Sequence, residues 1–187
     1  MPGSRPVLGD LLAATYDELD ALRVEAVRIV RIDGKELFRS RPDEGSENEI
    51  AIADEALPLL KDAVVVHNHP SGWDFPPHHP MRAGKSFSQE DVFFAIEFDV
   101  LELQAVTPIW VYWFHRPEDG WGLRARAAQR RYVDLVNDLA QEMLGLIVAG
   151  LLIVEEGEAE LFHQAMVALC QEMGAGYGRW RRRLEFH

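Results

Sequence analysis

Residues 64–91 of the chain read VVVHNHPSGWDFPPHHPMRAGKSFSQED. The three consecutive valines predict a buried β-strand. His67 and His69 follow at a spacing of two, so both imidazoles are expected to leave the same face of that strand. Pro70 then ends the strand. Two histidines on one strand face, with a carboxylate returning from a nearby helix start, supply three protein ligands and leave a fourth position open, which is the arrangement of a catalytic zinc site.

The composition predicts one ordinary folded domain with an appendage. The 187 residues are 48% hydrophobic, which allows a sizeable core, and the formal net charge of −12 argues against nucleic acid as the main partner. Cys170 is the only cysteine, so a reducing, cytoplasmic compartment is expected. The longest apolar run, residues 144–154, is shorter than the about 20 residues of a membrane span. It is therefore interpreted as a buried helix segment, and no membrane partner is expected.

Upstream of the histidines, the patterns predict a helix followed by the start of a sheet. Leucines near helical spacing predict an amphipathic helix from residue 8 to about residue 23. Residues 24–32 are rich in valine and isoleucine and predict a strand. Asp33-Gly34 is a strong hairpin signal, so residues 36–39 are expected to pair back as a second strand.

Short elements are expected on both sides of the histidine strand. The acidic residues 41–49 predict a solvated loop, and residues 54–61 predict a short helix. After the histidines, a short helix with a wide apolar face is expected to end near Asp99. Residues 101–107 and 109–115 then predict two strands that form a hairpin.

The C-terminal part predicts two long helices. Their apolar stripes comprise Tyr132, Leu135, Val136, Leu139, Met143 and Ile147 in the first helix, and Leu161, Phe162, Ala165, Met166, Leu169 and Met173 in the second. Glu156 and Gly157 are expected to divide the helices. The stripes favour core packing or an interface, so self-association through these helices is a further prediction. Residues 179–183 (RWRRR) predict a basic tail that caps a helix end or binds an acidic patch.

The segment 88–91 (SQED) has two interpretations. In the first, it is a helix capping box, in which the Ser88 hydroxyl bonds the Asp91 amide and the carboxylate reaches back. In the second, the Asp91 carboxylate joins His67 and His69 as a metal ligand. The sequence has two histidines on one strand face, followed by a capped helix with a carboxylate in its first turn. Each feature alone is common, but their coincidence favours the metal site.

These residues resemble the signature of the JAMM (MPN-plus) metalloproteases, especially the JAB-like and RadC-like members from bacteria and phages. The resemblance rests on HNHPSG at residues 67–72, followed by Phe87-Ser88 and Asp91-Val92. A weaker similarity extends from about residue 22 to residue 117.

The resemblance implies an α+β (α/β/α-like) fold, in which helices flank a mixed central β-sheet of the JAMM/MPN type. The JAMM/MPN-like metalloprotease domain would occupy residues 1–120. Residues 121–187 would form a C-terminal two-helix extension that packs on this domain or serves as an interface.

The resemblance also implies roles for individual residues. His67, His69 and Asp91 would bind zinc (Zn²⁺), and the Ser88 hydroxyl would stabilise the oxyanion. A glutamate on an upstream strand would orient and deprotonate the zinc-bound water. These roles agree with general chemistry, because zinc lowers the pKa of its water to about 7 and a nearby carboxylate can pass the proton to the leaving amine.

Two glutamates are candidates for the general base. Glu25 opens the first strand and shares a face with Val27 and Ile29, whereas Glu36 follows the hairpin turn in a polar run. The family's glutamate comes near the start of a strand beside the histidine strand, which favours Glu25. Glu36 is the alternative base, although a charged residue just past an Asp-Gly turn is usually solvated.

The spacing between the ligands departs from the family pattern. The 21 residues between His69 and Asp91 exceed that pattern, so residues 73–85 are treated as an insertion. This insertion is rich in proline and predicts a flap over the cleft that selects substrate. Its adjacent His78 and His79 are not expected to bind metal, because no secondary structure fixes their direction.

The expected function is therefore that of a zinc-dependent metallopeptidase or isopeptidase acting on a protein or peptide substrate. The alternative is a non-catalytic JAMM-like scaffold or binding module in a phage or defence assembly, in which the C-terminal helices dock a partner. Hydrolysis of a non-peptide amide would use the same residues. Neither His115 nor His163 has a partner at metal spacing, and Cys170 lies on an apolar stripe, which disfavours it as a nucleophile.

Overall fold

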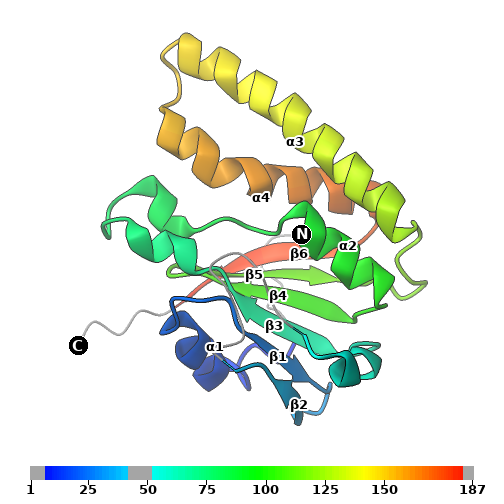
Figure 1. Ribbon diagram of the computed structural model, residues 1–187. Helices are drawn as coiled ribbons and strands as arrows, with labels where there is room; N and C mark the ends of the chain where they lie inside the picture. The colour runs from blue at the N-terminus through cyan, green and yellow to red at the C-terminus, as the bar shows by residue number, and fades with distance from the viewer. Residues whose placement is uncertain (1–6, 42–51, 183–187) are drawn as a thin grey trace.

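The computed structural model describes residues 7–41 and 52–182. Its centre is a six-stranded sheet with the strand order β2-β1-β3-β4-β5-β6 (Figure 1). The strands are β1 (Val27–Val30), β2 (Glu36–Arg39), β3 (Val64–Asn68), β4 (Glu102–Val106), β5 (Trp110–His115) and β6 (Gly176–Arg181). Neighbours β3 and β4 are parallel and the other neighbouring pairs are antiparallel. The predicted α+β class with a mixed central sheet is confirmed.

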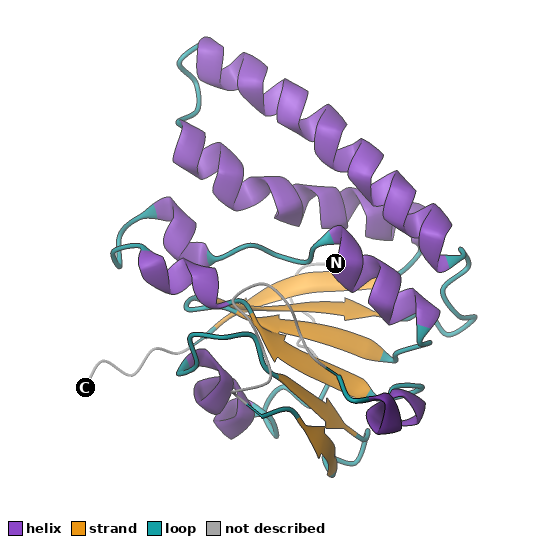
Figure 2. Cartoon of the chain, in the orientation of Figure 1, coloured by secondary structure: helices purple, strands orange, loops and turns teal. Residues whose placement is uncertain are grey.

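Helices cover both faces of this sheet (Figure 2). The α-helices are α1 (Ala13–Asp20), α2 (Gln89–Glu97), α3 (Ala125–Val148) and α4 (Val154–Met173), and the short 3-10 helices are η1 (Asp54–Leu59), η2 (Pro70–Asp74) and η3 (Pro80–Ala83). Successive side chains of a strand point to opposite faces. Val64 and Val66 therefore pack in a cluster with α1, whereas Val65 packs in the cluster that includes α2, α3 and α4. This explains why every residue of β3 is buried.

The two predicted hairpins are confirmed. Strands β1 and β2 pair across the turn at Asp33-Gly34, where Gly34 has a φ of 87° that favours glycine. Strands β4 and β5 also pair as predicted. The N-terminal helix is shorter than expected, because regular helix begins only at Ala13. The predicted helix at 54–61 is the 3-10 helix η1, and the loop predicted at 41–49 lies, except for Arg41, outside the described residues.

The two C-terminal helices are confirmed, but the predicted division at Glu156-Gly157 is wrong. The break falls at residues 149–153, and both of these residues lie in the first turn of α4. A Cβ atom at Gly157 would lie only 3.3 Å from the Leu152 side chain and 3.5 Å from that of Ile147. Gly157 therefore permits close packing at the start of the helix instead of ending one.

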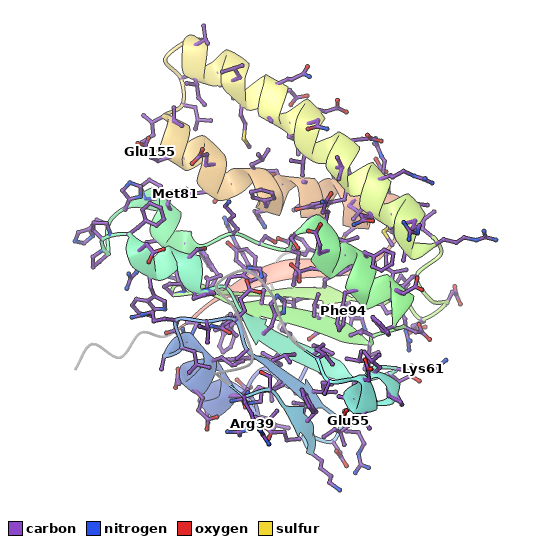
Figure 3. All side chains as sticks on the ribbon, in the orientation of Figure 1. Arg39, Glu55, Lys61, Met81, Phe94 and Glu155 are labelled. Atoms are coloured by element: carbon purple, nitrogen blue, oxygen red, sulfur yellow. The ribbon has the colours of Figure 1, made fainter. Side chains whose placement is uncertain are left out.

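The interpretation of residues 144–154 as a buried helix segment is also wrong. These residues form the tip of the α3–α4 hairpin, which extends away from the sheet (Figure 3), where Glu155 lies at the start of α4. Six large apolar side chains of the tip are 45–80% exposed: Leu144, Leu146, Val148, Leu151, Ile153 and Val154. Among the described residues, no helix is long and apolar enough to cross a membrane.

Residues 176–181 form the edge strand β6, which the sequence patterns did not predict. The strand pairs with β5 through six residues. Its glycines make room for a neighbouring aromatic side chain, because a Cβ atom at Gly178 would lie 2.8 Å from the Trp113 ring. The expected binding of an acidic patch is found in the ion pairs of Arg182 with Asp17 (2.7 Å) and Asp20 (2.6 Å). Both carboxylates lie in the last turn of α1. Through β6 the C-terminal part completes the same sheet.

Candidate metal centre

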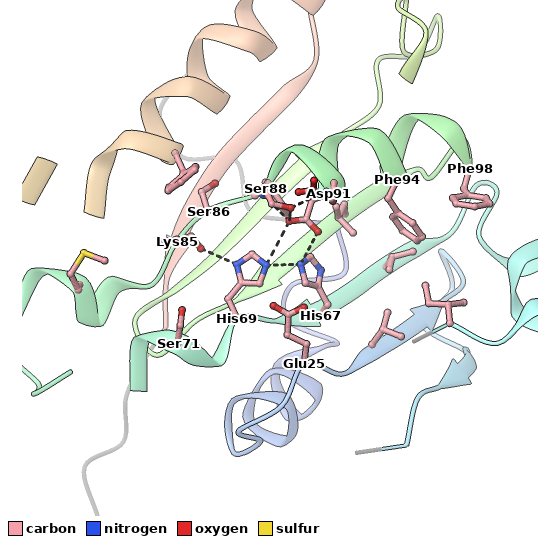
Figure 4. Close-up of a pocket in the computed structure, with 18 of the residues that line it drawn as sticks. Glu25, His67, His69, Ser71, Lys85, Ser86, Ser88, Asp91, Phe94 and Phe98 are labelled. Atoms are coloured by element: carbon pink, nitrogen blue, oxygen red, sulfur yellow. Dashed lines mark hydrogen bonds and ion pairs between the residues drawn. The ribbon is translucent and has the colours of Figure 1, made fainter. Parts of the chain in front are cut away.

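Three predicted ligands converge at the end of β3 (Figure 4). His67 lies in β3 and is fully buried, His69 follows the strand, and Asp91 lies in the first turn of α2. The Nε2 atoms of the two histidines are 2.9 Å apart, and they lie 3.3 Å and 3.7 Å from the Asp91 carboxylate oxygens. A tetrahedral zinc ion bound at about 2.0–2.1 Å would hold its ligand atoms about 3.3 Å apart. The three side chains therefore fit a metal ion of this size.

This group is distinctive within the described part of the chain. Among residues 7–41 and 52–182, no other set of at least three histidine, cysteine or acidic side chains converges in this way. His115 pairs instead with Glu102 at 3.2 Å, as expected for a residue without a metal partner. Cys170 is buried, and this burial raises the pKa of its thiol. A thiolate nucleophile is therefore disfavoured there.

A backbone carbonyl orients His69. The Nδ1 atom lies 3.0 Å from the Lys85 carbonyl oxygen, which can only accept a hydrogen bond. Nδ1 must therefore carry the proton, and the lone pair of Nε2 faces the cluster. Such a partner on the second nitrogen is the usual support of a metal-binding histidine. The corresponding Nδ1 of His67 is buried and has no hydrogen-bond partner among the described residues.

Asp91 serves two structural purposes at once. One carboxylate oxygen accepts hydrogen bonds from the Ser88 amide (2.7 Å) and the Ser88 hydroxyl (2.8 Å), and the hydroxyl accepts from the Asp91 amide (3.1 Å). This is the predicted capping box. The other oxygen faces His67. The capping box therefore holds the carboxylate in place and does not compete with the metal interpretation.

The electrostatics of the cluster favour the protonation states that a cation requires. Burial opposes ionisation of Asp91, but His67, His69 and the Ser88 amide outweigh it and lower the pKa of this carboxyl. Burial lowers the pKa of the His69 imidazole, as does the neighbouring His67. An ionised carboxylate and a neutral imidazole are the forms that bind metal.

Glu25, and not Glu36, lies at this centre. Glu25 lines the same cavity as the three ligands and points towards the histidines (Figure 4). Burial raises the pKa of its carboxyl to about 7, His69 opposes this shift, and Asp91 adds to it. Glu36 forms ion pairs with Arg39 (2.9 Å) and Arg28 (3.7 Å) on the outer strand β2.

A cavity of about 890 Å³ opens over the three ligands. Ser71 and Ser88 line it beside the metal centre, and the insertion at 73–85 contributes part of its wall. No residue of the insertion belongs to the converging group of His67, His69 and Asp91. His79 stacks on Phe75 at 4.8 Å and accepts a hydrogen bond from the Met81 amide. That the adjacent histidines bind no metal stays a prediction.

The insertion is fastened to the N-terminal helix through Trp73. The guanidinium groups of Arg23 and Arg82 lie 4.6 Å and 3.8 Å from the centre of its ring, and its Nε1–H donates to Asp20 at 2.9 Å. Arg82 also donates to the carbonyl of Phe75 at 2.8 Å. This cluster holds the cavity wall against α1.

Replacing Trp73 with alanine is expected to lower the free energy of unfolding by about 2 kcal/mol, since the variant loses the cation–π contacts and the hydrogen bond. Trp73→Phe keeps an aromatic ring and should lose only about 1 kcal/mol. Urea denaturation measures both values, and limited proteolysis reports local opening of the insertion. Equal losses in the two variants would show that the guanidinium contacts contribute nothing.

The C-terminal elements position the segment that precedes α2. The Tyr132 hydroxyl of α3 donates to the Phe87 carbonyl at 2.6 Å. The Tyr177 hydroxyl of β6 lies 2.8 Å from Ser86 Oγ and 2.7 Å from Nδ1 of His163. The sequence patterns missed this contribution, because these partners lie 14 to 91 residues apart in the chain and belong to no common motif. The region after residue 121 therefore supports the metal centre.

His163 should make stability depend on pH. Burial, assisted by the charge of Arg179 and opposed by that of Glu160, lowers its pKa to about 4 from an ordinary value of about 6.5. Between these values the unfolded state binds more protons than the folded state. The stabilisation is therefore fully present above about pH 6.5 and is lost as the pH falls towards 4.

Replacing His163 with glutamine is expected to reduce the loss of stability on acidification. Denaturant unfolding of both proteins at pH 7.5 and pH 4.5 measures this loss. The wild-type chain should lose more stability than His163→Gln between these two conditions. Identical losses would show that His163 keeps its ordinary pKa in the folded protein.

Comparison with known proteins adds no relative. A scan of protein-family models finds no match to this chain, and searches of curated proteins and solved structures find none either. Function must therefore be inferred from the site itself.

Proposed function

We propose that this protein is a JAMM-type zinc metallopeptidase or isopeptidase that hydrolyses an amide bond in a protein or peptide. The convergence of His67, His69 and Asp91 in a cavity that also contains Glu25 carries this proposal. Two imidazole nitrogens and one carboxylate, with a position left open, form the ligand set of many catalytic zinc sites. The HNHPSG run at residues 67–72 supports the same class.

The donor chemistry selects zinc over harder cations. Calcium and magnesium prefer ligand sets made of oxygen, whereas imidazole nitrogens suit zinc and other transition metals. When bound, zinc polarises a carbonyl and supplies a water whose pKa falls to about 7. The protein contributes the orientation of His69 through the Lys85 carbonyl and the negative charge of Asp91.

Glu25 is the proposed general base. Its carboxyl can accept and release a proton near neutral pH, because its pKa is raised to about 7. In the proposed reaction Glu25 removes a proton from the attacking water and delivers it to the leaving amine. A general base works best when its pKa lies near the working pH.

Ser88 is the proposed oxyanion partner. Its hydroxyl lines the cavity at the N-terminus of α2, where the helix dipole also favours negative charge. In its present position the hydroxyl donates to Asp91 at 2.8 Å. It must turn towards the substrate to donate to the developing oxyanion.

Metal removal tests this function directly. The purified chain is expected to contain zinc, to hydrolyse peptides from an unfolded protein mixture, and to lose this activity on treatment with a chelator. Added zinc should restore the activity. A chain that neither contains nor binds zinc, or whose hydrolysis resists complete chelation, would contradict the proposal.

The second candidate function is a non-catalytic scaffold that binds a partner. The exposed apolar tip of the α3–α4 hairpin favours it, because large exposed apolar patches commonly mark interaction sites. Self-association through these helices also stays a prediction. The cavity over the ligands supports the catalytic proposal, since an enzyme requires this space and a scaffold does not.

A further inference from the structure

The cavity over the metal centre continues along α2 as an apolar arm. Figure 4 shows Phe94 on α2 and Phe98 directly after its last residue, on the side of the ligands away from Ser71 and Lys85. The arm is lined by Val27, Leu57, Val65, Phe94, Phe98 and Leu103. The charged residues that line the cavity, among those described, lie at the metal centre, in the first turn of α2 or on the side of the insertion. The arm is therefore apolar along its length.

The helix α2 forms one wall of this arm. Phe94 and Phe98 follow Asp91 at spacings of three and seven residues, so all three side chains lie on one helix face. The two aromatic rings are 5.2 Å apart between centroids. At about 1.5 Å per residue, Phe98 lies about 10 Å along the helix from Asp91. This wall is therefore long enough to contact a large substrate side chain along its length.

Beneath the arm lie strand residues that are almost fully buried, since Val27, Val65 and Leu103 are 0–1% exposed. Val65 precedes His67 by two residues in β3, and Val27 follows Glu25 by two residues at β1, so each apolar residue shares a face with a polar residue of the centre. The pairing sets Val27 opposite His67 and Leu103 opposite Val65. Beside each of these polar residues of the centre, the same face of the chain therefore carries a buried apolar residue.

We infer that this arm binds a bulky apolar side chain adjacent to the amide bond that the enzyme hydrolyses. The substrate class is then an amide flanked on one side by a residue such as leucine or phenylalanine. The inference rests on the proposed hydrolytic function. The physical reason is that an apolar side chain leaves water for a preformed surface, in which the half-buried Leu57, Phe94 and Phe98 lie over buried strand residues.

A set of capped peptides that differ only at the residues flanking the cleaved bond tests this inference. Each flanking position carries glycine, alanine, leucine, phenylalanine or glutamate in turn, and the zinc-loaded full chain hydrolyses each peptide. The value of kcat/KM should rise by about tenfold or more from glycine to leucine or phenylalanine at one of the two positions. Equal values at both positions, or a preference for glutamate, would overturn the inference.

Two neighbouring phenylalanines provide a matched pair of variants. Phe94→Gln places an amide in the arm and should reduce the ratio of kcat/KM between the phenylalanine and glycine peptides. Phe93→Gln is the control, because Phe93 does not line the cavity and lies 5.8 Å from the Arg126 guanidinium. It should keep the wild-type ratio. An equal reduction in both variants, or no reduction in Phe94→Gln, would show that the arm does not select the substrate.

A binding measurement separates this inference from the proposed function. N-acetyl-leucinamide and N-acetyl-glycinamide are titrated into the protein, and NMR follows the methyl groups of Val27, Leu57 and Val65. If the protein binds the leucine compound preferentially but hydrolyses none of the peptides, the result supports the apolar binding site and contradicts the proposed hydrolytic function. If the enzyme hydrolyses the peptides but neither assay shows a preference for an apolar side chain, the result supports the proposed function and contradicts the inference about the arm.

Discussion

Replacing Asp91 with asparagine is expected to lower the affinity of the protein for zinc by more than about 100-fold, since loss of a supporting residue alone commonly costs 10- to 100-fold. The substitution removes the negative charge of the cluster and leaves two neutral imidazoles. Asparagine nearly matches the shape of aspartate, and its amide oxygen can still accept the hydrogen bond from the Ser88 amide. The fold should therefore survive, and the effect should appear in metal binding.

Competition with a chromogenic chelator measures the affinity, and elemental analysis of the purified variant measures zinc content. His79→Gln is the matched control, because His79 is a histidine of the insertion that lies outside the converging ligands. This control should retain zinc at the wild-type level. If Asp91→Asn bound zinc as tightly as the wild-type protein, Asp91 would not be a metal ligand.

Replacing Glu25 with glutamine is expected to lower kcat by about 10²- to 10⁴-fold, the usual contribution of a general base. Glutamine keeps the size of the side chain but cannot accept the proton. Glu25 is not one of the converging ligands, so the variant should still bind zinc. The variant should therefore lose hydrolysis but keep its zinc content, which distinguishes loss of proton transfer from loss of metal.

Glu36→Gln is the control for this experiment. Glu36 lies on β2 in ion pairs with arginines, and its replacement should leave turnover near the wild-type value. If Glu25→Gln kept full turnover while Glu36→Gln lost it, the proton-transfer role would belong to Glu36. Loss of zinc in Glu25→Gln would instead indicate that Glu25 supports the metal.

The elements that the sequence predicted well are those with strong local signals. Asp33-Gly34 predicted the first hairpin, because the turn requires the positive φ that glycine allows. Three valines predicted β3, and the pattern at 88–91 predicted the capping box that begins α2. Each signal lies within a few residues of the feature that it describes, so no knowledge of the rest of the fold was needed.

The errors concern features that depend on distant packing. Residues 144–154 are apolar, yet exposed, because the α3–α4 hairpin extends past the edge of the sheet. Gly157 marks close packing at the start of α4 instead of the end of a helix. The strand β6 was missed because its glycines weaken the strand pattern, and pairing with β5 supplies the missing stability.

The same distinction applies to the candidate site. The spacing of His67 and His69, the capping pattern at Asp91 and the resemblance to the metalloprotease signature together predicted that these side chains converge, and strand and helix geometry fix their directions. Only the folded chain distinguishes Glu25 from Glu36 and brings the Lys85 carbonyl to His69. These contacts join residues far apart in the sequence, and local periodicity carries no information about such distances.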